Sequence, residues 1–228
     1  MSASRPLTTP HLFVDILFDA LLFGKLMSRT LRIGKHRNIY NIGDEHKMIY
    51  FIESGQIKLV LPSLDGKECL LAIYTTKDLF GESCMAGTGA YLEMATAMTD
   101  TTLKGIYYRH LLKFLHDESL YVDFVMYFAA RLAEQQQIIA DMATTGSEYR
   151  LGRVLLQLCR KLGKRGPFSI RIENRISHEE LSQIVGTTRP RISIFIQKFR
   201  SLGLLEISAE RFLIVREKEL SDYLARRN

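Results

Sequence analysis

Two arginines near the C-terminal end, Arg189 and Arg191, are the side chains of this 228-residue chain best suited to chemistry. A guanidinium can donate two parallel hydrogen bonds to O6 and N7 of a guanine in the major groove of DNA, while hydroxyl groups and lysines serve phosphates. Groups of this second kind lie around the arginines, at Thr187, Thr188, Ser193 and Lys198. We therefore predict that these six residues bind DNA. The alternative is that they are solvated groups on an amphipathic helix.

Catalytic motifs are missing from the sequence. It contains no GxSxG, no GxxxxGK[ST], no HExxH and no GxGxxG. Glu179 and Glu180 are adjacent, so they point to different faces and cannot act as a carboxylate pair. We predict no catalytic residue and no enzymatic activity.

The three cysteines, Cys69, Cys84 and Cys159, are too far apart to form a metal or thiolate cluster. An odd number of cysteines is typical of reduced thiols in the cytoplasm. We predict no metal site and no cofactor.

The six candidate residues follow a short helix with clear boundaries. Ser177 is a predicted N-cap and Glu180 completes a capping box, while Gly186 ends the helix. A second helix starts at Thr187 and Thr188 and has an apolar face of Ile192, Phe195, Ile196, Phe199 and Leu202. Two short helices joined through a glycine predict a helix-turn-helix.

Two β-rich runs, Leu204–Ile207 and Phe212–Val215, follow the second helix and are separated by a turn-prone segment. They predict a two-stranded wing, which makes the motif more specific than either part alone. Around it we expect a helix over 148–162, a basic loop over 161–167, a strand over 168–172 and a final helix over 217–227.

Charge is divided unevenly along the chain. Residues 147–228 contain 17 Lys and Arg against 9 Asp and Glu, a net charge of +8, so the other 146 residues hold 14 against 16, a net charge of −2. One basic end is typical of a chain that binds a polyanion there. No apolar run is long enough to span a bilayer and the first residues lack the layout of a signal peptide, so we expect a cytoplasmic protein without a membrane partner.

The first half of the chain changes from helical to strand-like periodicity. Residues 11–31 predict one or two helices. Beyond them, strand-like runs over 48–52, 56–61 and 68–74 are bracketed by turn signals at 41–44, 54–55 and 65–66. Closely spaced short strands predict an antiparallel barrel or sandwich.

A long helix is predicted over residues 119–145. Its seam residues step by three and four in alternation: Val125, Phe128, Leu132, Gln135, Ile139 and Met142. A heptad seam predicts a partner helix, and Gln135 is its single polar member. The alternative is one helix packed against its own domain.

The stretch HEELSQIVGTTRPRISIFIQKFRSLGLLE resembles the DNA-binding end of the Crp/Fnr family of transcriptional regulators, and the resemblance extends over nearly the whole chain. It implies an α+β fold with three parts. These are an N-terminal antiparallel β-roll, a jelly roll like the cyclic-nucleotide-binding domain, over 1–118; a long dimerisation helix with its hinge over 119–146; and a winged helix-turn-helix over 147–228.

The resemblance also implies an effector pocket in the roll. Gly81, Glu82 and Ser83 match the segment that holds the sugar and cyclic phosphate in the family, and polar ligand contacts fall near Gln135 and Gln136. Members that bind cyclic AMP carry an arginine and then a serine or threonine before an alanine; aligned on Ala95, those places hold Glu93 and Met94. Because glutamate repels a phosphate, we expect control by cyclic AMP to be lost and the effector to be unknown.

The predicted function is that of a homodimeric, sequence-specific regulator of transcription that binds double-stranded DNA, with RNA polymerase as a possible partner. The family's base-reading positions correspond to Arg189, Pro190 and Ile194, so only the arginine keeps a hydrogen-bond donor. The alternative is a ligand-sensing or protein-interaction module that does not bind DNA, which would need neither the arginines nor the basic domain.

Overall fold

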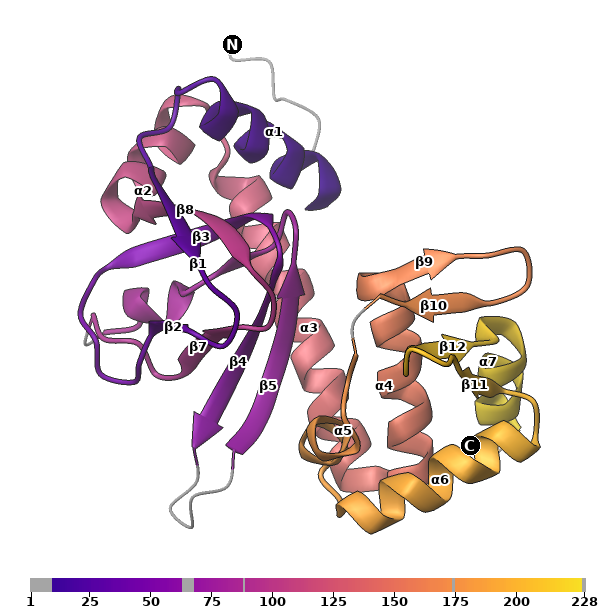
Figure 1. Cartoon of the computed structure of the whole chain (residues 1–228). Coiled ribbons are helices and arrows are strands. Elements are labelled where there is room, and N and C mark those ends of the chain that lie inside the picture. Colours follow the sequence, from indigo (N-terminus) through magenta and orange to yellow (C-terminus); the bar gives the residue numbers. More distant parts are fainter. Residues whose placement is uncertain (1–9, 63–67, 88, 174, 227–228) are drawn as a thin grey trace. The chain divides into compact units, whose positions relative to one another are not determined.

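The computed structural model describes residues 10–62, 68–87, 89–173 and 175–226 (Figure 1). The chain divides into two compact units, the first made of Met1–Lys67 and Leu71–Gln136 and the second of Glu68–Leu70 and Gln137–Asn228. The division falls inside helix α3 (Tyr121–Thr144), which confirms the long helix predicted over 119–145. The domain boundaries predicted at residues 118 and 146 stay predictions.

The first unit is built on two antiparallel sheets, in the strand orders β1-β8-β3-β6 and β2-β7-β4-β5 (Figure 1). Their strands are β1 (Arg29–Ile33), β2 (Asn38–Tyr40), β3 (Met48–Ser54), β4 (Gln56–Pro62), β5 (Glu68–Thr75), β6 (Leu79–Phe80), β7 (Met94–Ala97) and β8 (Thr101–Tyr107). The predicted antiparallel β-roll is confirmed. The turn predicted at residues 65–66 lies outside the described residues.

The N-terminal helix is shorter than the periodicity of residues 11–31 predicts. Helix α1 (Pro10–Leu22) ends just before Gly24, which adopts a left-handed φ of 70°. Arg29 to Leu31 are not helical, because they belong to β1 and pair with β8, Leu31 opposite Leu103. Apolar spacing alone does not distinguish these residues from a continuing helix.

Two further helices pack on the roll. Helix α2 (Tyr108–Asp117) follows β8 directly, and the start of α3 packs against α1 through aromatic rings. The ring centroids of Phe13 and Tyr127 lie 5.7 Å apart, and those of Phe13 and Phe124 lie 6.1 Å apart. These contacts anchor the beginning of α3 to the core of the roll.

The second unit contains a winged helix-turn-helix beside a four-stranded sheet in the order β11-β12-β10-β9. Its elements are α4 (Ser147–Leu162), β9 (Gly163–Arg165), β10 (Ile170–Ile172), α5 (His178–Val185), α6 (Arg189–Ser201), β11 (Leu205–Ile207), β12 (Leu213–Val215) and α7 (Glu217–Ala225). Residues 163–165, predicted as part of a loop, form strand β9, because β10 offers them a pairing edge.

Three apolar side chains of α6, those of Ile192, Ile196 and Phe199, are buried in the core of this unit. Phe195, which the sequence placed on the same face, is only half-buried and Leu202 is exposed. Throughout the part of the chain that the structure describes, no helix has the length and apolar character needed to cross a bilayer.

Candidate nucleic-acid interface and effector pocket

The turn between α5 and α6 is fixed by its local sequence. The Ser177 amide donates to Glu180 Oε2 at 2.8 Å, and the Glu180 amide donates to Ser177 Oγ at 3.1 Å, which completes the predicted capping box. Gly186 takes a left-handed φ of 64° and ends α5. From α4, Arg150 Nε donates to the Val185 carbonyl at 2.8 Å, so the orientation of the turn is held by a third helix.

The first turn of α6 carries the predicted arginines in the open. Thr188, Arg189 and Arg191 are exposed and Thr187 is half-buried. Neither guanidinium has a hydrogen-bond or ion-pair partner among the described residues. The Thr188 hydroxyl makes no capping hydrogen bond, so it is not used inside the helix.

Electrostatics make this first turn unusual. The N-terminal end of a helix carries a partial positive charge, and a cation there costs ~0.3–1 kcal/mol. α5 follows this rule with Glu179 and Glu180 in its first turn, whereas α6 has no acidic residue there and two arginines instead. The two arginines therefore lower the stability of α6 slightly. They also concentrate positive charge at a helix end where backbone amides point outward.

Ser193 does not lie with the exposed arginines. Its Oγ donates to the Arg189 carbonyl at 3.2 Å and forms a hydrogen bond with His178 Nδ1 at 2.9 Å. The structure therefore uses Ser193 to join α5 to α6. Its predicted contact with DNA finds no support in this geometry.

Lys198 is also separated from the arginines. Its Nζ lies 2.8 and 3.0 Å from the two carboxylate oxygens of Glu148 on α4, and Tyr223 Oη donates to the same carboxylate at 2.5 Å. The hydrogen bond to Glu148 raises the pKa of Lys198. The predicted phosphate contact of Lys198 stays a prediction; the acid that pairs with its ammonium in this structure lies 50 residues earlier in the sequence.

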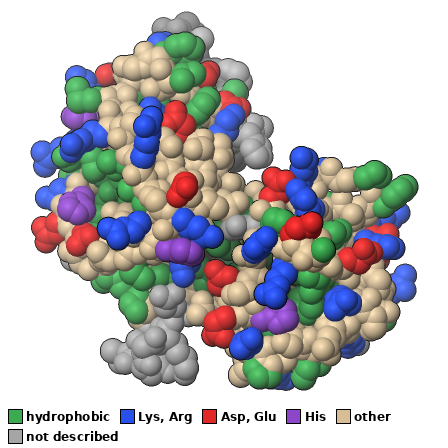
Figure 2. All heavy atoms as spheres, viewed as in Figure 1, with side chains coloured by type: hydrophobic (Ala, Val, Ile, Leu, Met, Phe, Trp, Pro, Cys, Tyr) green, Lys and Arg blue, Asp and Glu red, His purple; other side chains and the backbone are tan. Residues whose placement is uncertain are grey.

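Basic side chains of the second unit are spread over its visible face, with acidic ones between them (Figure 2). On this face the net charge of +8 over residues 147–228 is therefore not gathered in one patch. At the start of α6, two arginines lie in one helical turn without an acidic partner among the described residues, and total charge does not reveal this.

The predicted effector segment of the roll forms a tight turn. Gly81 has a φ of 87°, and a Cβ there would lie 3.1 Å from both the Met48 carbonyl oxygen and a ring carbon of Tyr50. The short 3-10 helix η1 (Glu82–Met85) begins directly after it. Glycine at this place is required by backbone conformation and by close packing.

Glu93 is buried and already hydrogen-bonded from within the roll. Ser83 Oγ donates to its Oε1 at 2.9 Å, and Tyr40 Oη donates to the same oxygen at 2.8 Å. Met94 is half-buried beside it and its sulfur accepts from Asn38 Nδ2 at 3.2 Å. Glu93 therefore contacts the turn at Ser83 through an internal hydrogen bond, which the sequence did not predict.

Arg131 is the residue of this pocket that the sequence analysis missed. From α3 it donates to Glu82 Oε1 at 2.8 Å and to the Leu79 carbonyl at 3.0 Å, and it also contacts the Tyr74 hydroxyl. Burial raises the pKa of Glu82, and the Arg131 charge opposes that shift. Arg131 lies four residues before Gln135, so both residues share one face of the same helix, and this spacing could have indicated it.

The other carboxylate oxygen of Glu82, Oε2, is buried without a hydrogen-bond partner among the described residues. Gln135 and Gln136, predicted to line the pocket, are exposed on α3, and neither side chain makes a hydrogen bond with another described residue. Within the first unit the structure does not bring them to Glu82 or Glu93.

Aromatic rings fill the roll next to these acids. The ring centroids of Tyr40 and Tyr91 lie 3.7 Å apart and those of Tyr50 and Phe80 lie 5.2 Å apart, both pairs stacked. Tyr91 Oη donates to the Met48 carbonyl at 2.7 Å, so its orientation is fixed. Among the described residues, no group of three or more His, Cys, Asp or Glu side chains is placed to hold a metal ion.

Family models cover most of this fold. Residues 30–118 match the cyclic nucleotide-binding domain, and residues 149–223 match the Crp-like helix-turn-helix domain.

Relatives of known name match along most of the chain. A CRP-like cAMP-activated global transcriptional regulator of Mycobacterium tuberculosis is 26% identical over 184 residues, which cover 80% of this chain and 82% of the relative. A global nitrogen regulator of Synechococcus elongatus is 24% identical over 209 residues, 90% of this chain and 94% of the relative. The crystal structure of a CRP-family transcriptional regulator from Thermus thermophilus matches with a TM-score of 0.71 at 25% identity, covering 86% of this chain and 96% of that one.

Proposed function

Because this chain belongs to the Crp/Fnr family of DNA-binding transcriptional regulators, we propose that it acts as a homodimer whose β-roll does not respond to cyclic AMP. The observation that carries the proposal is the Glu93 carboxylate, held by Ser83 and Tyr40 beside the half-buried Glu82. A cyclic nucleotide would bring a full negative charge to two carboxylates.

Glutamate in place of the arginine removes an attraction for the phosphate and adds a repulsion. A charge-assisted hydrogen bond contributes ~1.5–3 kcal/mol, and a repelling like charge adds to the loss when the arginine is replaced by glutamate. The guanidinium of Arg131, which lies in this pocket, is paired with Glu82 at 2.8 Å. Affinity for cyclic AMP should therefore be lower by orders of magnitude than in a relative that has the arginine.

Isothermal titration with cyclic AMP and cyclic GMP tests this part of the proposal. We expect no heat of binding at micromolar concentrations for the wild type. The variant Glu93→Arg with Met94→Ser should gain measurable binding, while Glu93→Gln with Met94→Ser serves as the control without the positive charge. Micromolar binding to the wild type would refute the proposal.

The dimer proposal rests on the exposed apolar seam of α3. Val125, Leu132 and Ile139 follow each other at intervals of seven residues, and their side chains are 63%, 55% and 67% exposed. A stripe of this kind needs a partner helix to leave water. Gln135, in the same seam, is positioned to set register.

Light scattering tests this second part. Leu132→Lys places a charge in the seam and should convert dimers into monomers at micromolar concentration, whereas Lys113→Ala on α2 should leave the dimer intact. A monomeric wild type would contradict the dimer. A dimer is expected to bind half-sites about 34 Å apart, one turn of DNA, or a multiple of that spacing.

We also propose a setting for this activity. A regulator of transcription works where the chromosome lies, so we place the protein in the cytoplasm, with RNA polymerase as its protein partner and without enzymatic activity of its own. Phe168, 88% exposed between β9 and β10, supports a protein contact in the second unit. Transcription in vitro with purified polymerase, comparing the wild type with Phe168→Ala at saturating DNA occupancy, tests the partner.

A further inference from the structure

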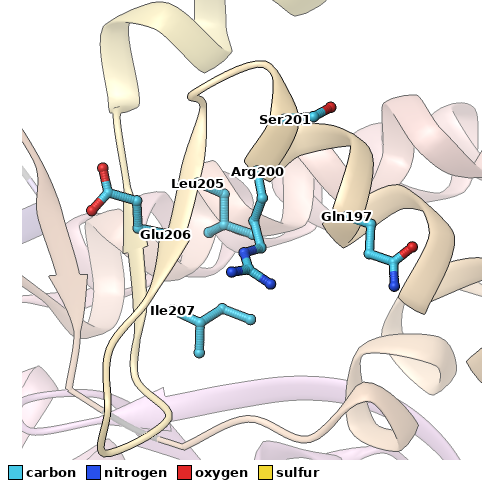
Figure 3. A pocket seen from close by; sticks show the side chains of 6 residues that line it. All are labelled: Gln197, Arg200, Ser201, Leu205, Glu206 and Ile207. Carbon is cyan, nitrogen blue, oxygen red and sulfur yellow. The ribbon is translucent and has the colours of Figure 1, made fainter.

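A groove lies between α6 and the first strand of the wing, away from the arginines of the first turn. It has a volume of about 530 Å³ and is lined by Gln197, Arg200, Ser201, Leu205, Glu206 and Ile207. Figure 3 shows the Arg200 guanidinium extending from the helix into the space beside Leu205 and Ile207. One long cation thus extends into a groove whose other lining residues are apolar or polar, with one acid, Glu206.

Arg200 is not compensated by the acid that lines the same groove. Along β11 side chains alternate in direction, so Leu205 and Ile207 share one face and Glu206 has the other. In Figure 3 Glu206 points away from Arg200, and its Oε1 accepts from Arg216 at 3.2 Å. Arg200 itself has no hydrogen-bond or ion-pair partner among the described residues. The groove therefore presents an unpaired positive charge.

The position of Arg200 along α6 connects this groove to the proposed DNA contact. Eleven residues separate it from Arg189, which is about three helical turns, so both side chains leave the same side of the helix. The separation along the axis is about 16 Å, whereas the major groove is about 12 Å wide. A helix that places Arg189 at the base edges thus carries Arg200 out to the phosphates that border the major groove of the DNA.

We propose that this groove receives the sugar-phosphate backbone of one DNA strand, with Arg200 paired to a phosphate and Gln197 donating beside it. The half-buried apolar side chain of Ile207 is suited to the deoxyribose between two phosphates, whereas Leu205 is buried in the core. The inference rests on the DNA-binding function and adds to it a backbone contact at the far end of α6. Lys198, two residues earlier, is excluded from this part because Glu148 already compensates it.

The salt dependence of DNA binding tests whether Arg200 contacts a phosphate. Each phosphate neutralised by the protein contributes about 0.9 to the slope of log K against log salt. Arg200→Ala should lower that slope by about 0.9 and weaken specific and non-specific fragments alike, so that its affinity falls about threefold less than that of the wild type between 50 and 200 mM salt. Arg200→Lys should keep the slope, and Arg200→Gln should lose it as alanine does.

Lys218→Ala, on α7, is the matched control, because it removes one exposed positive charge from the same unit. Its slope should equal that of the wild type. Fluorescence anisotropy with a labelled genomic fragment and a random duplex supplies the affinities, and circular dichroism confirms that each variant is folded.

An unchanged slope for folded Arg200→Ala and Arg200→Gln, in a protein that does bind DNA, would overturn the inference and leave the groove to an acidic protein partner. A wild type that binds no fragment would instead refute the DNA-binding function itself. A slope reduced equally by Lys218→Ala would show that the slope follows total charge, and would also overturn the assignment to Arg200.

Discussion

The effector pocket of the roll and the first turn of α6 treat charge in opposite ways. In the pocket, Arg131 binds Glu82 at 2.8 Å, and Glu93 accepts from Ser83 and Tyr40. In the first turn of α6, Arg189 and Arg191 are exposed and unpaired among the described residues, at the helix end where cations are least stable. A region whose charges are satisfied internally maintains structure, whereas one that keeps charges unsatisfied is available to a partner.

Removing the charge pair of the roll should have the largest effect. Arg131→Met leaves the Glu82 carboxylate without its cation, and breaking a buried pair in this way costs about 3 kcal/mol. Urea unfolding should show this loss in the free energy of unfolding. The double variant Arg131→Met with Glu82→Met should recover much of it, because no isolated charge is left.

A loss below about 1 kcal/mol for Arg131→Met would show that water compensates Glu82 and that the pocket is more open than its burial indicates. In that case the charges of the roll would be compensated by water, and the contrast with the first turn of α6 would not hold.

Removing an unpaired arginine should act on binding and leave stability alone. Arg189→Ala should weaken binding to the preferred site by ~1–3 kcal/mol and relax the preference at one guanine of each half-site. Anisotropy with a series of single-base variants of the site measures both. Lys218→Ala, on α7, removes an equal charge and should cause no change in preference.

If Arg189→Ala lowered affinity equally for every sequence, the arginine would be a phosphate contact. The exposed turn would still bind DNA, but base reading would have to pass to Arg191 or to the apolar contact of Ile194.

A smaller effect is expected in the pH dependence of stability. Burial raises the pKa of Glu82 in the folded protein, so the folded state holds more protons than the unfolded state above the unfolded value of about 4.3. Stability from this carboxyl is therefore present below that value and is lost as pH rises through the raised folded pKa.

We compare the free energies of unfolding of the wild type and Glu82→Gln over this range of pH. The wild type should gain stability relative to Glu82→Gln as the pH is lowered. A difference that does not vary with pH would mean that Arg131 keeps the carboxyl ionised and that the raised pKa is wrong. Tyr74→Phe, which keeps the carboxyl, is the control.

The parts of the molecule set by local rules could be predicted from the sequence. The capping box at Ser177, the left-handed Gly186 and the alternating strands of the wing need only neighbouring residues, and the structure has all three. The continuation of the first helix to Leu31 was wrong, because pairing of that strand with β8 involves residues some 70 positions away.

Side-chain partners could not be predicted in the same way. Lys198 reaches Glu148 across 50 residues and Arg131 reaches Glu82 across 49. Periodicity shows which face of a helix a side chain leaves, but not which charge lies opposite. For this reason neither the pairing of Lys198 with Glu148 nor that of Arg131 with Glu82 could be predicted.

The central claim is that the roll does not need a cyclic nucleotide for DNA to be bound. The most direct measurement is the anisotropy of a labelled target fragment titrated with the protein, with and without 1 mM cyclic AMP. The account predicts the same dissociation constant in both titrations, because Glu93 and Glu82 oppose the phosphate. A dissociation constant at least tenfold lower with cyclic AMP would contradict it.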